Sequence, residues 1–385
     1  MIKFITFGCW NKNCTGESKV KKVIDLAKEE EDIDFYIVTG DNYYQEKNTS
    51  STGEKIKSIN IDDLNCGLQL LKDLDKEIFL LLGNHDIEKT TMSIEGEEQV
   101  CETLNSEKKF LENTETKIKF ENTMFKEVGN TFIIMIDSNI YDLSEDLSCY
   151  GEERGILIRN QMSLIMSKLE KPFTNIIICA HHPLIGFKNQ EIKTETKKGK
   201  VKEKVKGGLD TYNEALYMLL LKIKEKQDSA KFFYLCADIH NYQNGIVTIK
   251  TADQKNMIIY QYIVGIGGTD LDTDYNEKYS DPFVPDPEEG VKVLKATKPI
   301  NAYIQLEYEL LEHSSIHGLL IVTIEDDVIT FTSKFIIDES LGGTRKSRKS
   351  RKSRKSRKSR KSRKSRKSRK SRKSRKSRKS RKIKN

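Results

Sequence analysis

Four short polar clusters follow apolar stretches of the sequence, and they contain the residues best suited to chemistry. Each cluster comes after a run of aliphatic and aromatic residues that is long enough for a β-strand. The clusters cover residues 40–44, 83–86, 180–183 and 237–241, and they hold four of the six histidines of the chain. Imidazole, carboxylate, amide and phenol groups in this combination suit Fe, Mn or Zn rather than Ca or Mg alone. The pattern therefore indicates a metal site.

The apolar stretches alternate with segments in which apolar residues recur at helical spacing. Expected strands comprise residues 2–8, 35–39, 78–82, 131–136, 175–180 and 232–236. Expected helices lie around residues 20–27, 64–74, 161–169 and 212–222. This alternation predicts an α/β fold with a substantial core. Ligands of such folds bind beyond the carboxyl ends of the strands, so we expect the four clusters to meet at one edge.

After about residue 245 the sequence changes character and predicts strands alone. These strands comprise residues 246–250, 257–264, 302–309, 319–324 and 328–335. A strand-rich end after an α/β core predicts a second sheet packed on the first. Polar segments at 45–60, 92–120 and 188–207 interrupt the pattern. We expect the Lys-rich segment 188–207 to be a solvated loop; a lid that attracts anionic substrate is the alternative, because the segment follows the third cluster.

The order of the motifs resembles that of a known superfamily. The motifs are Gly-Asp-x-x-Tyr from Gly40, Gly-Asn-His-Asp from Gly83, His-x-Pro from His181 and His-Asn from His240. Together they resemble the calcineurin-like metallophosphoesterases, and the first motif is most like that of the small purple (tartrate-resistant) acid phosphatases. Gln161 is similar to a residue in the helix that these proteins carry between the second and third motifs. The resemblance implies a four-layer sandwich of two mixed β-sheets flanked by helices.

The resemblance also implies two metal ions. Asp41 would be the carboxylate that bridges both. Tyr44 and His240 would bind the first ion, whereas Asn84 and His181 would bind the second. A tyrosinate ligand favours Fe(III), so the implied pair is a ferric ion and a divalent Fe, Zn or Mn ion.

Three positions depart from the family pattern. Cys9 stands where the family has an Asp on the first metal ion, and Asp238 stands where it has a His on the second. A thiolate is a good soft ligand and a carboxylate a good hard one, so we keep both residues in the ligand set. A buried apolar role is the alternative for Cys9. Gln190 stands where purple acid phosphatases have a substrate-facing His.

Two further histidines are assigned to the substrate. By resemblance His85 would not bind metal; it would lie at the metal edge, where it binds phosphate or protonates the leaving oxygen. His181 and His182 are adjacent, and neighbouring side chains at the end of a strand point in opposite directions. We therefore expect His181 to be the ligand and His182 to be structural or substrate-facing.

These expectations predict a phosphomonoesterase of the acid-phosphatase type, which acts on a phosphorylated small molecule or a phosphoprotein. In such a reaction two metal ions clamp the phosphate and activate a bound water molecule. The departures at Cys9, Asp238 and Gln190 support a rival: a protein that keeps the fold without turnover and has a binding or structural role. A third possibility is a nucleic-acid-binding protein whose functional part is the basic end of the chain.

The net charge of +9 conceals two oppositely charged parts. From Arg345 onward the chain carries 27 of its 67 Lys and Arg residues and no acid, so the preceding part has 40 basic against 58 acidic residues. The repeated Arg-Lys-Ser triplets cannot form a core, so we expect a disordered tail at 345–385 after a linker at 339–344 and a phosphoesterase domain at 1–338. The tail could bind nucleic acid or acidic membranes without sequence preference. Its composition resembles that of basic tails on proteins of large DNA viruses.

The cysteines and the N-terminal residues indicate in which cellular compartment the protein is expected. The chain has seven scattered cysteines, which predicts free thiols and a reducing environment. The apolar stretch at the N-terminus is too short for a secretory signal, and no apolar run is long enough to span a membrane. We therefore expect an intracellular protein, whether cytoplasmic, nuclear or virion-associated, rather than a secreted one.

Overall fold

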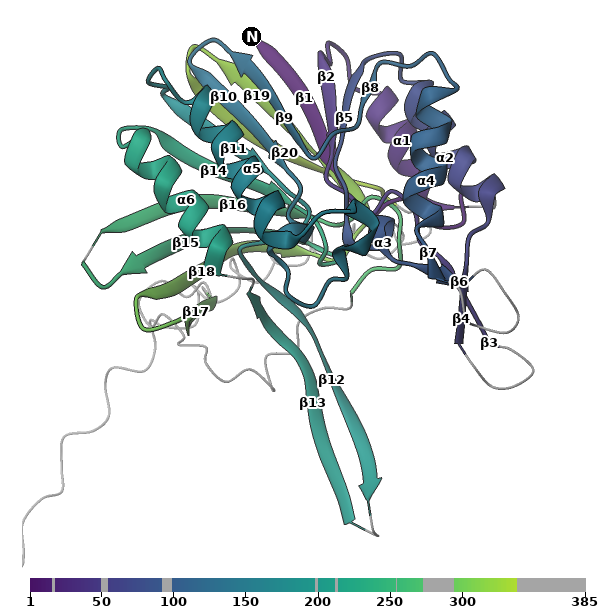
Figure 1. The fold of residues 1–385 in the computed structure, drawn as a ribbon. Helices are drawn as coiled ribbons and strands as arrows, with labels where there is room; N and C mark the ends of the chain where they lie inside the picture. Colours follow the sequence, from purple (N-terminus) through teal and green to yellow (C-terminus); the bar gives the residue numbers. More distant parts are fainter. Residues whose placement is uncertain are drawn as a thin grey trace, which may run out of the picture. The chain divides into compact units, whose positions relative to one another are not determined.

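Two β-sheets organise the chain in the computed structural model (Figure 1). The structure describes residues 1–15, 18–49, 55–91, 99–197, 200–211, 214–253, 255–272 and 294–337. The expected linker at 339–344 and tail at 345–385 lie outside these residues, so the boundaries predicted for them stay predictions. No helix in the described part of the chain is long and apolar enough to span a membrane.

Both sheets are mixed. The first has the order β20 (Val328–Phe335), β19 (Gly318–Glu325), β1 (Ile2–Phe7), β2 (Phe35–Val38), β5 (Glu77–Leu80) and β8 (Ile118–Lys119). The second has the order β17 (Leu294–Pro299), β18 (Ile304–Ser314), β15 (Tyr242–Thr251), β16 (Asn256–Val264), β14 (Lys231–Cys236), β11 (Asn175–Cys179), β10 (Thr131–Ile136) and β9 (Thr123–Val128). In each sheet a parallel set, β1-β2-β5-β8 or β10-β11-β14-β16, is extended by antiparallel strands.

Alternate residues of the second sheet belong to two different cores, which shows how the layers stack. In β10, Ile133 and Met135 pack with residues of the first sheet. Phe132 and Ile134 instead pack with the helices on the other face. Because successive side chains of a strand point to opposite faces, the second sheet is covered on both sides, and its central strands are buried along their whole length.

Helices complete the outer layers of the sandwich (Figure 1). The helices α1 (Lys19–Lys28) and α2 (Ile61–Lys72) contribute apolar side chains to the core of the first sheet. The helices α5 (Arg154–Lys168) and α6 (Glu214–Lys226) do the same for the second sheet. The expectation of two mixed sheets flanked by helices is thereby confirmed.

All three polar segments form regular structure that sequence reasoning did not predict. Segment 45–60 pairs β3 (Glu46–Thr49) with β4 (Lys55–Ser58). The Lys-rich segment is an antiparallel hairpin of β12 (Ile185–Lys197) and β13 (Lys200–Thr211), so the expectation of a solvated loop is wrong. Its charged residues alternate with Ile192, Thr194 and Thr196, and this period of two is typical of a strand. Segment 92–120 contains α4 (Glu102–Glu112), which was missed because its buried face includes Thr103 and Glu107.

Four cysteines form disulfides, so the expectation that all are free thiols is wrong. Cys14 pairs with Cys66, and Cys101 pairs with Cys149. The Cα–Cα distances of 5.8 and 5.6 Å are in the ordinary range for disulfides. The partners are 52 and 48 residues apart in sequence, so only the tertiary fold brings them together. The remaining cysteines, Cys9, Cys179 and Cys236, are buried and free.

Candidate metal centre

Three of the expected ligands lie in similar turns that directly follow strands. Cys9 comes after β1, Asp41 after β2 and Asp238 after β14. All three have left-handed backbone conformations, with φ values of 52°, 53° and 58°. Asp adopts this conformation more readily than most residues, because its short polar side chain can form local hydrogen bonds. Each turn ends its strand and places the side chain of the candidate ligand at the edge of the sheet.

The loops after β2, β5 and β11 approach one another at Gly83. A Cβ atom on Gly83 would lie 2.3 Å from Asp41 Oδ1 and 2.9 Å from His181 Cε1. Gly83 is the N-cap residue of the short helix α3 (Asn84–Ile87). The absence of a side chain at this position therefore lets Asn84, Asp41 and His181 share one site.

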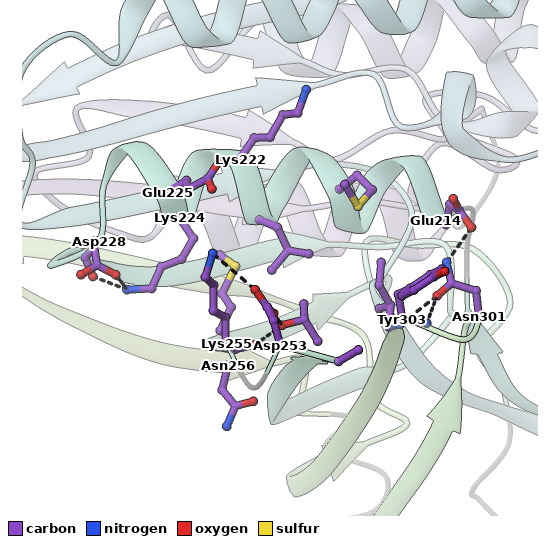
Figure 2. A pocket seen from close by; sticks show the side chains of 16 residues that line it. Glu214, Lys222, Lys224, Glu225, Asp228, Asp253, Lys255, Asn256, Asn301 and Tyr303 are labelled. Carbon is purple, nitrogen blue, oxygen red and sulfur yellow. Dashed lines mark hydrogen bonds and ion pairs between the residues drawn. The ribbon is translucent and has the colours of Figure 1, made fainter.

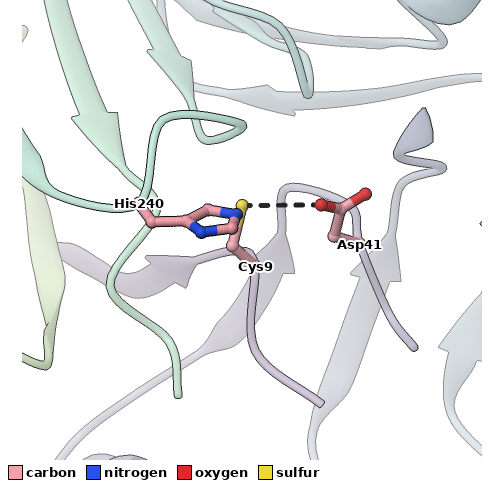
Figure 3. A group of neighbouring side chains, drawn as sticks. All are labelled: Cys9, Asp41 and His240. Carbon is pink, nitrogen blue, oxygen red and sulfur yellow. Dashed lines mark hydrogen bonds between the residues drawn. The ribbon is translucent and has the colours of Figure 1, made fainter. Parts of the chain in front are cut away.

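Cys9, Asp41 and His240, which Figure 3 shows together, form the first group of candidate ligands with Tyr44. Ligand atoms of Cys9, Asp41 and His240 lie within 4.8 Å of one another. The Cys9 Sγ lies 3.8 Å from Asp41 Oδ2, and the Tyr44 hydroxyl donates to the same oxygen at 2.8 Å. That hydroxyl also lies 3.2 Å from His240 Nε2. A set of sulfur, nitrogen and oxygen donors is appropriate for Fe or Zn.

His181, Asn84 and Asp238 form the second group, next to Asp41. His181 is fully buried, and its Nδ1 lies 2.8 Å from the carbonyl oxygen of Thr39. Because a carbonyl can only accept, Nδ1–H donates to it, and Nε2 is the ring atom that faces the other candidate ligands. This Nε2 lies 3.1 Å from Asn84 Oδ1, 3.3 Å from Asp41 Oδ1 and 4.0 Å from Asp238 Oδ1.

The second group fits a cation, because it brings together atoms that accept hydrogen bonds. A ring nitrogen that faces an amide oxygen and carboxylate oxygens needs a proton or a metal ion between them. Asp41 takes part in both groups: its Oδ1 is near His181, and its Oδ2 is near Cys9 and Tyr44. A carboxylate shared in this way fits a site for two ions.

Burial controls the charges in the first group. Burial, and next the Asp41 carboxylate, raises the pKa of the Cys9 thiol well above its usual range. The same two causes raise the pKa of the Tyr44 phenol. Burial also opposes ionisation of Asp41, but His181, His85 and Tyr44 outweigh it, so the pKa of Asp41 is lowered. A bound cation would lower the pKa of the thiol and of the phenol and let both groups ionise.

His85 lies beside Tyr44, with the ring centroids 4.6 Å apart. Its backbone N–H donates to Asp41 Oδ1 at 3.1 Å, and its Nδ1 lies 3.1 Å from Glu88 Oε2. Burial lowers the pKa of His85, but Asp41 and Glu88 outweigh burial and raise it to about 9. The ring is therefore cationic at neutral pH, with Nδ1–H donating to Glu88 and Nε2–H available as a donor.

The expectation that His181 and His182 point in opposite directions is wrong. β11 ends at Cys179, so both histidines lie in the turn that follows, where strand alternation no longer applies. Ligand atoms of both lie within 4.8 Å of Asp238 and of each other. Ser138 Oγ accepts from the backbone N–H of each histidine and lies 2.8 Å from His182 Nδ1. The hydroxyl proton therefore goes to Nδ1, and His182 Nε2 carries the ring proton.

Several residues of the site were missed at the level of sequence. Asp137, Ser138 and Asn139 follow β10 as a fifth polar cluster, and the rule that found the other clusters would have found this one. Glu88 comes three residues after His85 in a helical turn, and i,i+3 pairs on a helix lie close together. Asp86 belongs to the second motif but was given no role.

Gln190 and a groove along α6 are not part of the two ligand groups. Gln190 is in β12, but its side chain is outside the described part of the structure, so its substrate-facing role stays a prediction. A groove of about 880 Å³ lies along α6, the turn after β15 and Tyr303 (Figure 2). None of the expected ligands lines this groove, so it is separate from the candidate metal centre.

Comparisons with protein families, curated proteins and solved structures identify the family of this chain. The family described as Calcineurin-like phosphoesterase matches residues 2–242, which include all four polar clusters. A search of curated proteins finds no match. The crystal structure of TT1561 from Thermus thermophilus is similar at 10% identity and a TM-score of 0.35, covering 68% of this chain and 88% of that one. An archaeal phosphodiesterase is similar at 12% identity and a TM-score of 0.21, covering 52% of this chain and 81% of that one.

The match extends over more than half of the chain, and members of this family generally bind two metal ions. The two groups of candidate ligands lie within the matched residues. The chain belongs to the calcineurin-like phosphoesterase family and thus to the hydrolases that act on phosphoric ester bonds.

Proposed function

We propose that this chain hydrolyses phosphate monoesters at a two-metal site of the purple acid phosphatase type. The observation that supports this most directly is the position of Asp41. Its Oδ1 lies 3.3 Å from His181 Nε2, whereas its Oδ2 lies 3.8 Å from the Cys9 sulfur and accepts from Tyr44. A single buried carboxylate between two donor groups is what a pair of cations requires, since it offsets the repulsion between them.

Each donor group would hold one ion. Cys9, Tyr44 and His240 would hold the first, and Asn84, His181 and Asp238 the second, with Asp41 shared. A phenolate and a thiolate favour a ferric ion at the first position, and the harder second set favours divalent Fe, Zn or Mn. When bound, the ions would supply a polarised phosphate and a water molecule of lowered pKa.

His85 is the proposed proton donor. Its ring is held between the Tyr44 ring and the Glu88 carboxylate, and Lys57 Nζ lies 2.9 Å from the other oxygen of Glu88. This chain of contacts fixes the orientation of the imidazolium. Its Nε2–H would donate to the leaving oxygen of the ester as the bond to phosphorus breaks, which is general acid catalysis.

His182 and Gln190 are proposed to bind the substrate. Burial lowers the pKa of His182 to about 4, so its ring is neutral. Because Ser138 occupies Nδ1, His182 would offer Nε2–H to a phosphate oxygen. The phosphorylated substrate would be a small molecule or a phosphoprotein.

The basic tail is proposed to contact polyanions rather than to take part in hydrolysis. It contains 27 Lys and Arg residues and no acid. Binding of this kind to nucleic acid or acidic lipid would be independent of sequence and would weaken steeply with salt. All the proposed ligands precede residue 242, so deletion of the tail should leave hydrolysis of a small ester unchanged.

The test combines metal analysis with an aryl phosphate assay on the full chain and on Asp41→Asn. We expect the parent protein to hold two metal ions and to hydrolyse the monoester faster than an aryl phosphodiester. Asp41→Asn should lose both metal and turnover. Asp326→Asn is a matched control, because Asp326 also has a left-handed backbone, with φ of 47°, but lies in the exposed β19–β20 turn.

Each result separates the proposal from its rivals. Preference for the diester would contradict the monoesterase assignment, and full metal content in Asp41→Asn would contradict the bridge. A parent protein that binds no metal and has no turnover would instead support the rival in which the fold has a binding role.

A further inference from the structure

Asn42 is a buried polar residue to which the proposed reaction gives no role. It directly follows Asp41 in the loop after β2, and its side chain has no exposed surface. A buried amide without hydrogen-bond partners costs free energy, so the partners of this side chain matter. They come from the loops after β1 and β5, which carry other candidate ligands.

The side chain of Asn42 joins the loops that follow β1, β2 and β5. Its Oδ1 accepts from the indole Nε1–H of Trp10, in the loop after β1, at 3.3 Å. Its Nδ2 donates to the carbonyl oxygen of Leu81 at 2.8 Å and to Asp86 Oδ2 at 3.0 Å. Both of these acceptors belong to the stretch after β5 that carries Asn84.

The chemistry of the partners fixes the orientation of the Asn42 amide. An indole N–H can only donate and a carbonyl can only accept, so the amide oxygen faces Trp10 and the amide nitrogen faces Leu81. Nδ2 has an acceptor for each of its two hydrogens, and Oδ1 has a donor. An apolar side chain of the same size would break all three contacts. Asn42 is therefore held in one orientation, with contacts to two other loops.

Trp10 makes the contact with the loop after β1 a rigid one. Its side chain has no exposed surface and packs edge-on against Phe7 of β1, with the ring centroids 6.1 Å apart. Its backbone N–H donates to the carbonyl oxygen of Asp41 at 3.3 Å. Because a closely packed ring cannot move independently of its backbone, the Asn42 amide and the backbone next to Cys9 hold each other in place.

We propose that Asn42 is a positioning residue that holds the loops of Cys9, Asp41 and Asn84 in register for the metal ions. It acts through the backbone of these loops rather than by contact with an ion or with the substrate. Candidate ligands for both ions lie on these loops, so loss of the Asn42 amide should weaken both metal sites. The inference rests on the proposed function, because the three residues are ligands only under that proposal.

Asn42→Leu tests the proposal, because Leu has a similar volume and forms no side-chain hydrogen bonds. We expect this variant of the full chain to bind Zn²⁺ more weakly by on the order of 10–100-fold, as is typical when a residue behind a metal ligand is lost. Asn175→Leu is the matched control. Asn175 is also buried, and its Nδ2 donates to the Asp327 carbonyl oxygen at 2.9 Å and to Thr131 Oγ1 at 3.2 Å. It begins β11, at the opposite end of the strand from His181, so this control should lose stability and bind Zn²⁺ like the parent protein.

A double-mutant cycle with Trp10→Phe separates positioning from packing. Trp10→Phe removes the indole N–H and should weaken Zn²⁺ binding by about 2–10-fold, the equivalent of one hydrogen bond. In the Asn42→Leu background the same change should have a much smaller effect, because the acceptor is already absent.

Three outcomes of the Zn²⁺ titration would overturn the proposal. If Asn42→Leu binds Zn²⁺ as tightly as the parent protein and the Asn175→Leu control, Asn42 does not position the ligands. If Trp10→Phe has the same effect in both backgrounds, the hydrogen bond does not join the loops. If Asn42→Leu does not fold, Trp10→Phe decides alone, and Zn²⁺ binding equal to that of the parent protein would contradict the proposal.

The single tryptophan of the chain provides a test that does not depend on metal binding. In metal-free protein labelled with ¹⁵N, the Trp10 indole N–H gives one cross-peak in a ¹H–¹⁵N NMR spectrum. We expect this peak to move upfield in the proton dimension in Asn42→Leu, where the N–H has lost its acceptor, and to stay in place in Asn175→Leu. An unmoved peak in Asn42→Leu would refute the link. A parent protein that binds no Zn²⁺ but shows the shift would instead refute the proposed function and leave Asn42 as the link between the loops.

Discussion

Replacement of Gly83 by Ala should separate the two halves of the candidate metal centre. The backbone of Gly83, with φ of −104° and ψ of 177°, suits any residue, so the effect is purely steric. The new methyl group would lie 2.2 Å from the Asp41 nitrogen and 2.3 Å from Asp41 Oδ1, whereas ordinary contact begins at 3.4 Å. The loops must therefore move apart by about 1 Å, which is several times the tolerance of about 0.2 Å for metal–ligand distances.

We expect Gly83→Ala to lose at least one metal ion per chain and most of its turnover. The overpacked contact should also lower the free energy of unfolding by about 1–3 kcal/mol. Metal analysis of the purified variant, chemical denaturation and the aryl phosphate assay measure the three quantities. The free energy of unfolding is compared for metal-free samples, so that loss of a bound ion is not counted as strain.

Gly155→Ala is the control, because Gly155 lies within α5 and an added Cβ would meet a single atom, the Arg159 Nη1, at 3.5 Å. An Ala in a helix is more favourable than a Gly by about 1 kcal/mol, so this variant should be as stable as the parent protein or more so. Unchanged metal content and stability in Gly83→Ala would show that the loops do not need this close approach, and the reasoning would fail.

Three further predictions concern the same site. Cys9→Asp should keep the first metal ion, because Asp suits both the ligand role and the left-handed backbone; Cys9→Ala should lose it, and metal analysis of both variants decides. In the metal-free protein, the pKa of His85 is raised to about 9, so His85 stabilises the fold fully below about pH 6.5 and less as the pH rises through 9. The pKa of Glu88 is lowered to about 2, so Glu88 stabilises the fold fully above about pH 4.5 and less as the pH falls through 2. Chemical denaturation across this pH range should therefore show that the free energy of unfolding depends less on pH in Glu88→Gln, at both the acidic and the alkaline end. Removal of metal by a chelator should lower the Tm of the parent protein, since a ligand bound only by the folded state stabilises it, and an unchanged Tm would contradict a resident metal.

The arrangement of the strands could be predicted because each strand is marked by a pattern within its own short stretch of sequence. Each parallel strand before a polar cluster is a continuous apolar run, as in β10 and β11, whose residues are all buried. The carboxyl ends of parallel strands meet at one edge, so Asp41, Asn84 and His181 could be placed together without a structure. The direction in which the His182 side chain points could not be predicted from the sequence, because it depends on the residue at which β11 ends.

The elements that were missed depend on long-range contacts. The buried face of α4 includes Glu107, an acidic residue of a type that is almost never fully buried. The cysteines of each disulfide come from segments that are about 50 residues apart, and seven cysteines allow many pairings. In both cases the burial or pairing of the residue depends on segments that are distant in sequence, which local patterns do not reveal.

The backbone at Cys9 argues that its thiol serves the site rather than the core. A left-handed conformation costs an ordinary L-residue about 1–2 kcal/mol, and Asp is one of the few residues for which the cost is reduced. Cys9 has a φ of 52°, close to the 53° of Asp41 and the 58° of Asp238, so the chain repeats one turn at three strand ends. A small apolar residue chosen only for packing would not require this turn. The turn instead directs the Cys9 sulfur toward the Asp41 carboxylate, 3.8 Å away. Strain at a buried polar contact is typical of functional sites, and here it supports the thiol as a ligand that takes the position of a carboxylate.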